Sequence, residues 1–341
     1  MKLQEYAEQG RTYVVAEIAQ AHDGSIGILH SLVEAVAATG VDAVKFQMHI
    51  ADAESSTLEP FRTPFSYVDA QRIDYWRRME LPLEAWFCLK KKCESLSVEF
   101  LATPFSNAAV DLLEQLQVKR YKIGSGDLTN SLLLERLART GKEVILSTGL
   151  GLLDEIDEAV ARLRGYGVPV AVLQCTTLYP TRASDIGLAW METLRQRYAC
   201  PVGLSDHSAT TYAALGAVAL GANIVEAHVT FDRRMFGPDA QASLTIDEFA
   251  DLVQGIRFLE QARGNGLGKV VTEDQQSMRR IFGRSLAVKR AMRAGEIVQF
   301  DDLEGKKPAD AGLSVVKLDW VIGKSLKCDK VSGDFLQEGD V

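Results

Sequence analysis

Eight short apolar runs alternate with amphipathic stretches, and this alternation constrains the fold more than any other feature of the sequence. The stretches between the runs, such as LHSLVEAVAATG and LLDEIDEAVARLRGYG, place apolar residues three and four positions apart, which is typical of helices. Nearly continuous apolar strands separated by helices indicate a parallel sheet covered on both faces. The predicted strands are residues 13–20, 43–49, 99–105, 120–126, 143–149, 170–177, 201–208 and 223–231.

Eight such units in about 260 residues match the usual length of a (β/α)8 TIM barrel, which we predict for residues 1–264. A doubly wound sheet is the alternative, but no glycine-rich nucleotide turn follows the first strand. One insertion, residues 51–82, interrupts the rhythm after the second strand and is rich in aromatic residues. Because the loops after barrel strands lie on the catalytic face, we expect it to form a wall or a lid.

The composition changes after residue 264. Residues 265–284 are predicted to be a linker, and residues 285–341 a small β-rich domain. This domain contains a repeat, because GEIVQFDDL from Gly295 resembles GDFLQEGDV from Gly333. Two copies of a turn followed by a strand favour a pseudo-symmetric domain, with chance similarity as the alternative.

Composition excludes several classes of protein. The net charge of −8 argues against a nucleic-acid surface. We find no apolar stretch long enough for a bilayer and no signal peptide at the N-terminus. The five cysteines are odd in number and irregularly spaced, which indicates reduced thiols and a cytoplasmic location.

Polar residues gather where the predicted strands end, the edge of a barrel that holds the active site. Four of the five histidines lie there, namely His22, His49, His207 and His228. Lys45 and Lys122 lie inside apolar strands, where an unpaired ammonium group is unfavourable, so we expect an anionic partner. Together with nearby hydroxyl groups, these two lysines predict a cationic bowl that binds a phosphate, or a ligand with both a phosphate and a carboxylate. These hydroxyl groups belong to Thr103, Ser125, Ser147 and Ser205.

His207 and His228 end the seventh and eighth strands, which are neighbours in a barrel, so both imidazoles could hold one divalent metal ion. Glu17 stands across the mouth as a possible acid, base or sugar anchor. Ser205 taken alone is more simply a helix cap. A nucleophilic Ser205–His207 pair is disfavoured, because residues two apart on a strand lack the required reach.

Several motifs in this order together resemble the sialic acid synthase family, whose members make N-acetylneuraminate and related nonulosonic acids. The motifs are AEIAQAHDGS, AVKFQMH, ATPFS, YKIGSGD, ILSTGL, LQCTTLYPT, GLSDHS and EAHVTFDRRMFGPD. The resemblance implies a TIM barrel followed by that family's antifreeze-like SAF domain at residues 285–341. It also implies condensation of phosphoenolpyruvate with an N-acylated hexosamine aldehyde, typically N-acetylmannosamine, with C–O cleavage and release of phosphate.

The resemblance assigns roles to individual residues. Mn²⁺ or Mg²⁺ would lie on His207 and His228, and Glu17 and Asp127 would handle protons. The domain-swapped homodimer of the family would bring Lys307 to the partner's site. Phosphoenolpyruvate would contact Lys45, Thr103, Lys122, Ser125, Ser147 and Ser205, and the sugar would contact Gln47, Tyr179, Asp239 and Lys307.

Two departures leave the sugar open. Asp127 stands where the family often has glutamate, and Lys307 stands where it commonly has an arginine for the N-acyl group. Lysine cannot replace arginine at a planar site. The product could therefore be Kdn, legionaminic acid or pseudaminic acid. Other classes are a Schiff-base aldolase with Lys122 as the nucleophile, and ice binding, which leaves the rim of the barrel unexplained.

Overall fold

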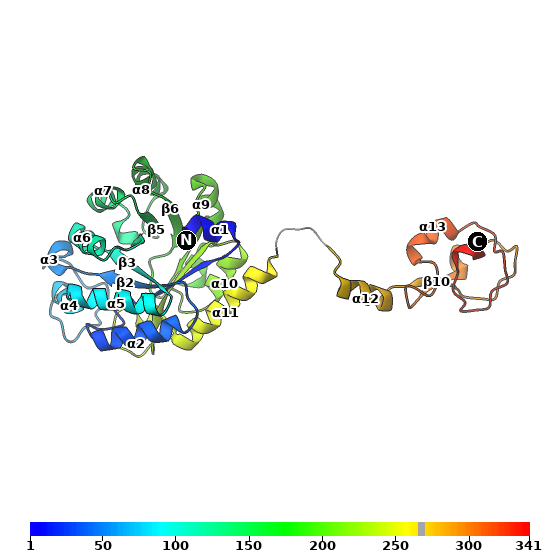
Figure 1. Cartoon of the computed structure of the whole chain (residues 1–341), viewed down its shortest axis with the longest axis horizontal. Coiled ribbons are helices and arrows are strands. Elements are labelled where there is room, and N and C mark those ends of the chain that lie inside the picture. Colours follow the sequence, from blue (N-terminus) through cyan, green and yellow to red (C-terminus); the bar gives the residue numbers. More distant parts are fainter. Residues whose placement is uncertain (265–269) are drawn as a thin grey trace. The chain divides into compact units, whose positions relative to one another are not determined.

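The computed structural model describes residues 1–264 and 270–341 and divides the chain into two units, Met1–Gly264 and Asn265–Val341. In the first unit, parallel strands form ladders in the order β3-β2-β1-β8-β7-β6-β5-β4, and β3 packs beside β4. The sheet is thereby nearly closed into a barrel, with helices around it (Figure 1). The strands are β1 Tyr13–Glu17, β2 Ala43–Met48, β3 Glu99–Pro104, β4 Arg120–Ile123, β5 Glu143–Ser147, β6 Val170–Cys175, β7 Val202–Asp206 and β8 Ile224–Thr230.

The predicted TIM barrel is confirmed, and its packing explains the apolar strands. One buried cluster, which includes Val15, Leu101 and Ile224, fills the interior of the barrel. A larger cluster lies between the strands and the helices. The barrel helices are α1 Leu3–Glu8, α2 Ile26–Ala37, α5 Leu83–Ser95, α6 Asn107–Gln115, α7 Ser131–Ala138, α8 Leu153–Gly165, α9 Trp190–Tyr198, α10 Tyr212–Ala219 and α11 Ile246–Ala262.

Most strands end earlier than predicted. Residues 18–20, 124–126, 176–177 and 207–208 leave the ladder and form the loops above the strands. These segments carry polar side chains that face the mouth of the barrel. They were predicted as strand because the sequence pattern continues past the last ladder hydrogen bond. A short strand, β9 Leu244–Thr245, extends the ladder of β8 before α11 begins.

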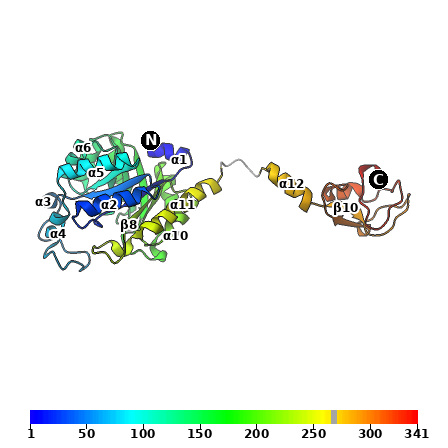
Figure 2. The ribbon, with the colours of Figure 1, turned by 60° about the horizontal axis from the view of Figure 1, so that its bottom comes forward.

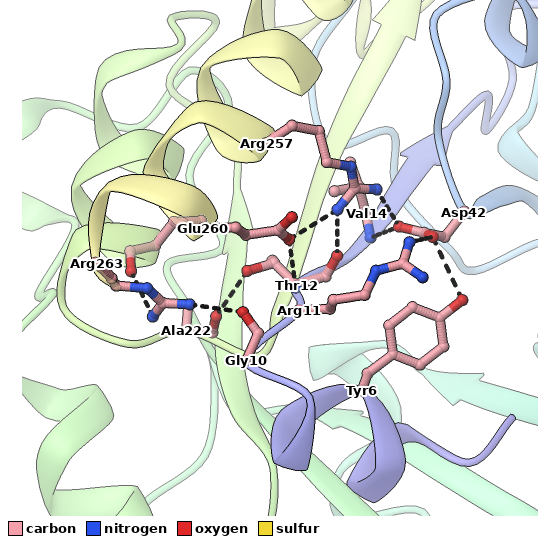
Figure 3. Close-up of polar contacts among 11 residues, drawn as sticks. Tyr6, Gly10, Arg11, Thr12, Val14, Asp42, Ala222, Arg257, Glu260 and Arg263 are labelled. Atoms are coloured by element: carbon pink, nitrogen blue, oxygen red, sulfur yellow. Dashed lines mark hydrogen bonds and ion pairs between the residues drawn. The ribbon is translucent and has the colours of Figure 1, made fainter. Parts of the chain in front are cut away.

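A polar network at the opposite end of the barrel joins the last helix to the first strand (Figure 3). The Asp42 carboxylate accepts hydrogen bonds from the Val14 N–H at 2.9 Å and from Arg257 of α11 at 2.7 Å. Glu260 accepts from the Thr12 N–H at 2.6 Å. Figure 2 shows α11 beside α10 along this side of the barrel, and the two helices are in contact. The network satisfies backbone groups that β1 would otherwise leave without partners.

The insertion forms two helices, α3 Ala51–Glu54 and α4 Arg72–Met79, with a small core of its own. Arg78 ties α4 to the loop after β1, because it pairs with Asp23 and with Asp69, the latter at 2.7 Å. Gly24 in that loop has φ +76°, and a Cβ there would lie 2.4 Å from the Arg78 carbonyl oxygen. The insertion is therefore fixed against the barrel wall.

The second unit holds one antiparallel pair, β10 Ser285–Val288 with β11 Leu303–Lys306, several isolated β-bridges and the short helix α13 Leu318–Val321, so regular strands are fewer than expected. Within the predicted linker, residues 273–282 form helix α12 Glu273–Phe282 with Thr272 as its N-cap. Residues 265–269 of that linker lie outside the described residues.

The two repeats of the second unit share one local conformation. Gly295 and Gly333 have φ of 93° and 97°. Each copy ends in a 3-10 turn closed by an aspartate, Asp302 on the Gln299 N–H and Asp340 on the Gln337 N–H. The strand predicted after the turn of each repeat thus ends in a 3-10 turn, because these capping hydrogen bonds replace the hydrogen bonds of a ladder.

No helix among the described residues is both long enough and apolar enough to span a membrane.

Candidate active site

A cavity of about 350 Å³ opens at the carboxyl ends of the barrel strands. Its size falls in the range usual for small-molecule sites. Every residue assigned a role above lines it, with the exception of Lys307. The residues brought together are Glu17, Lys45, Gln47, Thr103, Lys122, Ser125, Asp127, Ser147, Tyr179, Ser205, His207, His228 and Asp239.

Two lysines and two glutamates form the floor of this cavity, and all four are buried. The Lys45 Nζ lies 2.7 Å from Glu17 Oε2 and 3.6 Å from Glu226 Oε1. The Lys122 Nζ lies 3.3 Å from the same Glu226 oxygen. The expected cationic bowl is therefore wrong in one respect, because two carboxylates balance the two ammonium charges.

These pairings move the lysine pKa values in opposite directions. Burial opposes the charge of Lys45, but Glu17 and Glu226 raise the pKa of Lys45 above its usual value. Burial lowers the pKa of Lys122. The attraction of Glu226 opposes this effect, and the repulsion by Lys45 adds to it. The same lysines lower the pKa of Glu226 against the effect of burial, so its carboxylate stays ionised.

The predicted hydroxyl groups surround this floor. Lys45 donates to Thr103 at 3.2 Å and Lys122 to Ser147 at 2.7 Å. Ser205 donates to Glu226 at 3.1 Å and does not cap a helix. Ser125 accepts from the Gly149 N–H at 2.9 Å, and a Cβ at Gly149 would collide with Ser125 and Thr177. Ammonium and hydroxyl donors thus converge where an anion could exchange for the internal carboxylates.

The two imidazoles lie together above the floor, with ring centroids 5.0 Å apart. Burial, and next to it the charge of His228, keeps the pKa of His207 well below its usual value, so His207 is neutral. Its buried Nδ1 has no hydrogen-bond partner among the described residues. A neutral ring with an unpartnered nitrogen suits metal ligation. No third His, Cys, Asp or Glu joins the pair in a metal-binding group within residues 1–264 and 270–341. The pair therefore fits a divalent ion whose other ligands are water or substrate oxygens.

The insertion supplies the outer wall. The Arg62 guanidinium lies 4.0 Å from the centroid of the Tyr179 ring and pairs with Asp239 at 2.6 Å. Tyr179 in turn lies 4.2 Å from the His207 ring. Deeper in the cavity, His49 is stacked between Trp76 and Phe105, and its Nδ1 lies 2.6 Å from Glu54.

Two carboxyl groups of the cavity are held by hydrogen bonds from amide side chains. Gln47 donates to Glu17 at 2.8 Å, which orients that carboxylate beside Lys45. Burial raises the pKa of Asp127, which accepts a hydrogen bond from Asn130 at 2.9 Å. Lys307 belongs to the second unit, where its Nζ lies 4.9 Å from the centroid of the Phe282 ring.

Two charged residues of the cavity, Glu226 and Arg62, were not predicted from the sequence. Glu226 received no role from the sequence, although a carboxylate inside an apolar strand needs a partner as much as Lys45 does. Arg62 lies in an insertion without periodicity, and no local pattern predicts where its side chain points. His22 does not line the cavity; its Nδ1 accepts a hydrogen bond from the Gly24 N–H at 3.1 Å.

The sequence profile of the NeuB family matches residues 32–268, which cover most of the barrel. The chain belongs to the NeuB family. This NeuB family member is 35% identical to the N,N'-diacetyllegionaminic acid synthase of Campylobacter jejuni, over 92% of this chain and 95% of the relative. It is 27% identical to the pseudaminic acid synthase of the same organism, over 100% of this chain and 99% of that one.

Among solved structures, it is similar to the N-acetylneuraminic acid synthetase of Leptospira borgpetersenii. The TM-score is 0.70 at 28% identity, with 78% of this chain and 90% of the other covered. These relatives make three different sugar acids, so family membership alone leaves the sugar open.

Proposed function

We propose that this protein is a nonulosonic acid synthase, which condenses phosphoenolpyruvate with the open-chain aldehyde of an N-acylated hexosamine. The observation that carries the proposal is the convergence of Lys45, Lys122, His207 and His228 in one cavity. Two ammonium groups can bind an enol phosphate there, and two imidazoles lie beside it. The relatives, which are synthases of such acids, support the same reaction class.

The proposed reaction balances as follows. C3 of phosphoenolpyruvate attacks the aldehyde carbon, a C–C bond forms, and the aldehyde oxygen takes up a proton. Water then adds to C2, and the tetrahedral intermediate loses phosphate by C–O cleavage, which leaves a ketone. Lys45 and Lys122, with the hydroxyls of Thr103, Ser125, Ser147 and Ser205, bind the phosphate and the carboxylate. Holding both substrates in one cavity supplies much of the rate.

Asp127 and Glu17 divide the proton transfers in this proposal. A carboxyl group whose pKa is raised by burial is suited to donate, so Asp127 protonates the aldehyde oxygen. Glu17, held by Lys45 and Gln47, accepts the proton of the incoming water. Gln47, Tyr179 and Asp239 face the sugar.

His207 and His228 would hold Mn²⁺ or Mg²⁺, which when bound polarises the aldehyde as a Lewis acid. His207→Ala should abolish metal-dependent turnover while phosphoenolpyruvate still binds, and His30→Ala on the outer helix α2 is the control. Turnover would be followed with EDTA-treated and Mn²⁺-supplemented protein. An unchanged rate of the His207 variant in metal-free buffer contradicts this assignment.

The decisive experiment is a phosphate-release assay with the full chain and phosphoenolpyruvate. The acceptors are N-acetylmannosamine, mannose, and hexoses with two acylamino groups, each with and without Mn²⁺. N-acetylmannosamine gives N-acetylneuraminate, mannose gives Kdn, and the others give legionaminic or pseudaminic acids. Absence of release with every acceptor refutes the proposal.

A Schiff-base aldolase is the second candidate, favoured by the lowered pKa of Lys122. In that reaction the Lys122 amine would attack the carbonyl of pyruvate, with loss of water. Borohydride should then trap pyruvate on Lys122, whereas EDTA-sensitive turnover from phosphoenolpyruvate excludes it.

Three further proposals concern the whole protein. Residues 285–341 form an SAF domain, supported by the antiparallel pair of the second unit and by its repeats. The protein is a domain-swapped homodimer in which Lys307 reaches the partner's sugar, which light scattering and a Lys307→Ala variant would test. It acts in the cytoplasm, in keeping with its five unpaired cysteines.

A further inference from the structure

The outer half of the cavity combines a planar cation with an aromatic wall. Arg62 enters from the insertion and stacks on Tyr179 at 4.0 Å. Phe61, Phe65 and Tyr75 line the cavity beside it, with ring centroids of Phe65 and Tyr75 5.1 Å apart. A polar edge and an apolar surface therefore adjoin in one subsite.

Only one edge of the Arg62 guanidinium is engaged. Its Nη2 donates to Asp239 at 2.6 Å and to the Pro238 carbonyl oxygen at 3.1 Å. The Nε and Nη1 donors make no hydrogen bond to any residue in the described parts of the chain. Arginine presents five N–H donors in a fixed plane, so a second edge remains for a ligand.

The charge of Arg62 is already balanced by Asp239. An additional phosphate at this position would meet the Asp239 carboxylate, whereas a neutral acceptor would not. A carbonyl oxygen is the strong neutral acceptor common in sugar substituents. The subsite thus favours an amide carbonyl over an anion.

Tyr75 provides an independent observation. Its side chain is 1% exposed, and its hydroxyl has no hydrogen-bond partner among residues 1–264 and 270–341. A buried hydroxyl without a partner is unfavourable by itself, so a polar ligand group is expected near it. The amide of an acylamino group supplies such a group next to a methyl that the phenyl rings can cover.

We infer that Arg62 is the residue by which this enzyme selects acylamino sugars, an inference that rests on the function proposed above. Its Nε and Nη1 groups donate to the acyl carbonyl oxygen. Phe61 and Phe65 contact the acyl methyl group. Specificity for the sugar then lies in the barrel's own insertion, on the same subunit as the lysines and the imidazoles.

The test compares two acceptors that differ only in the substituent at C2, which is acetamido in one and hydroxyl in the other. For the wild type, Arg62→Met and Arg62→Lys, kcat/KM would be measured with N-acetylmannosamine and with mannose at saturating phosphoenolpyruvate. If the wild type uses only a hexose with two acylamino groups, that sugar is compared with the analogue in which a hydroxyl group replaces one of the two acylamino groups. The Arg62→Met variant should lower the preference for the acylated sugar about tenfold or more, and Arg62→Lys should lower it less. The KM for phosphoenolpyruvate should not change.

Arg77→Met is the matched control, because Arg77 lies in the same insertion, pairs with Asp52 at 2.8 Å and does not line the cavity. An equal loss with both acceptors would assign Arg62 to the support of Asp239 and Tyr179, and it would overturn the inference. So would a wild-type preference for a phosphorylated sugar that disappears in Arg62→Met. Absence of phosphate release by the wild type with every acceptor refutes the proposed synthase function itself, and this inference with it.

Discussion

Charged side chains inside apolar strands identify the cavity more clearly than the hydroxyl groups do. A serine or threonine at a strand end has several uses, whereas a buried ammonium must have a partner. Lys45 and Lys122 were predicted on this ground, and both lie on the cavity floor. In the protein alone these partners are Glu17 for Lys45 and Glu226 for both lysines.

Lys122→Met should weaken the binding of phosphoenolpyruvate about tenfold, because it removes one of two cations and a charged hydrogen bond. Titration calorimetry without sugar measures the Kd. Lys119→Met, at an exposed position just before β4, is the control and should leave the Kd unchanged. An unaltered Kd for Lys122→Met removes this residue from the anion site.

His22 gives a stability prediction. Burial lowers the pKa of His22 to about 4, so between pH 6.5 and 4 the unfolded chain binds a proton that the folded chain does not. The free energy of unfolding therefore decreases as the pH is lowered through this window. His22→Asn keeps an acceptor for the Gly24 N–H and should remove about 2 kcal/mol of the loss between neutral pH and about pH 5. Urea unfolding at several pH values measures it, and parallel curves for the two proteins contradict it.

At the scale of elements, periodicity predicted which segments are strands but not where the ladders end. Residues 124–126 after β4 and 176–177 after β6 look like strand in sequence, yet they turn into the mouth. The insertion shows the same limit. Its place above the catalytic face follows from topology, whereas the side-chain direction of Arg62 goes with its contact to Asp239, which is 177 residues away in sequence. Contacts between distant segments leave no local signal.

Helix α12 shows a complementary limit. None of its residues is buried, so it lacks an apolar stripe against a core, and its sequence reads as a linker. Its capping box at Thr272 and Gln275 is the signal that could have predicted it.

Gly203 gives a prediction for strand β7. A Cβ at this position would lie 2.0 Å from the Ile224 carbonyl oxygen of β8. The clash is between the backbones of two paired strands, and neither strand can move aside. Gly203→Ala should lower the free energy of unfolding by about 3 kcal/mol. Gly165→Ala at the end of α8 meets nothing within 4 Å and should be neutral or slightly stabilising. Thermal unfolding compares them; equal melting temperatures would contradict the predicted clash.

At the scale of the whole barrel, closure depends on polar contacts as well as on the β1–β8 ladder. Asp42 joins β1 to α11 through Val14 and Arg257, and it also accepts from Arg11 at 3.3 Å (Figure 3). The alternation of strands and helices predicts the barrel, but it does not predict this network, because its members are more than 200 residues apart in sequence.

Asp42→Asn should destabilise the barrel by about 2 kcal/mol, because it removes one of the two ion pairs of Arg257 in a partly buried site and leaves only the pair with Glu260. Asp111→Asn breaks a more exposed pair with Arg136 and should change stability by less than about 1 kcal/mol. Urea denaturation followed by circular dichroism separates the two. Similar losses would show that the network around Asp42 is dispensable.

The polar network between the first strand and the last helix of the barrel has a consequence for folding during synthesis. The amide groups of Thr12 and Val14 find their partners only through Glu260 and Asp42, and the latter is locked by Arg257. Because Arg257 and Glu260 lie in α11, these contacts are absent until nearly all of the 264 residues of the barrel unit have been translated, although β8 can already pair with β1. A nascent chain of this length must be kept from aggregating for most of its synthesis.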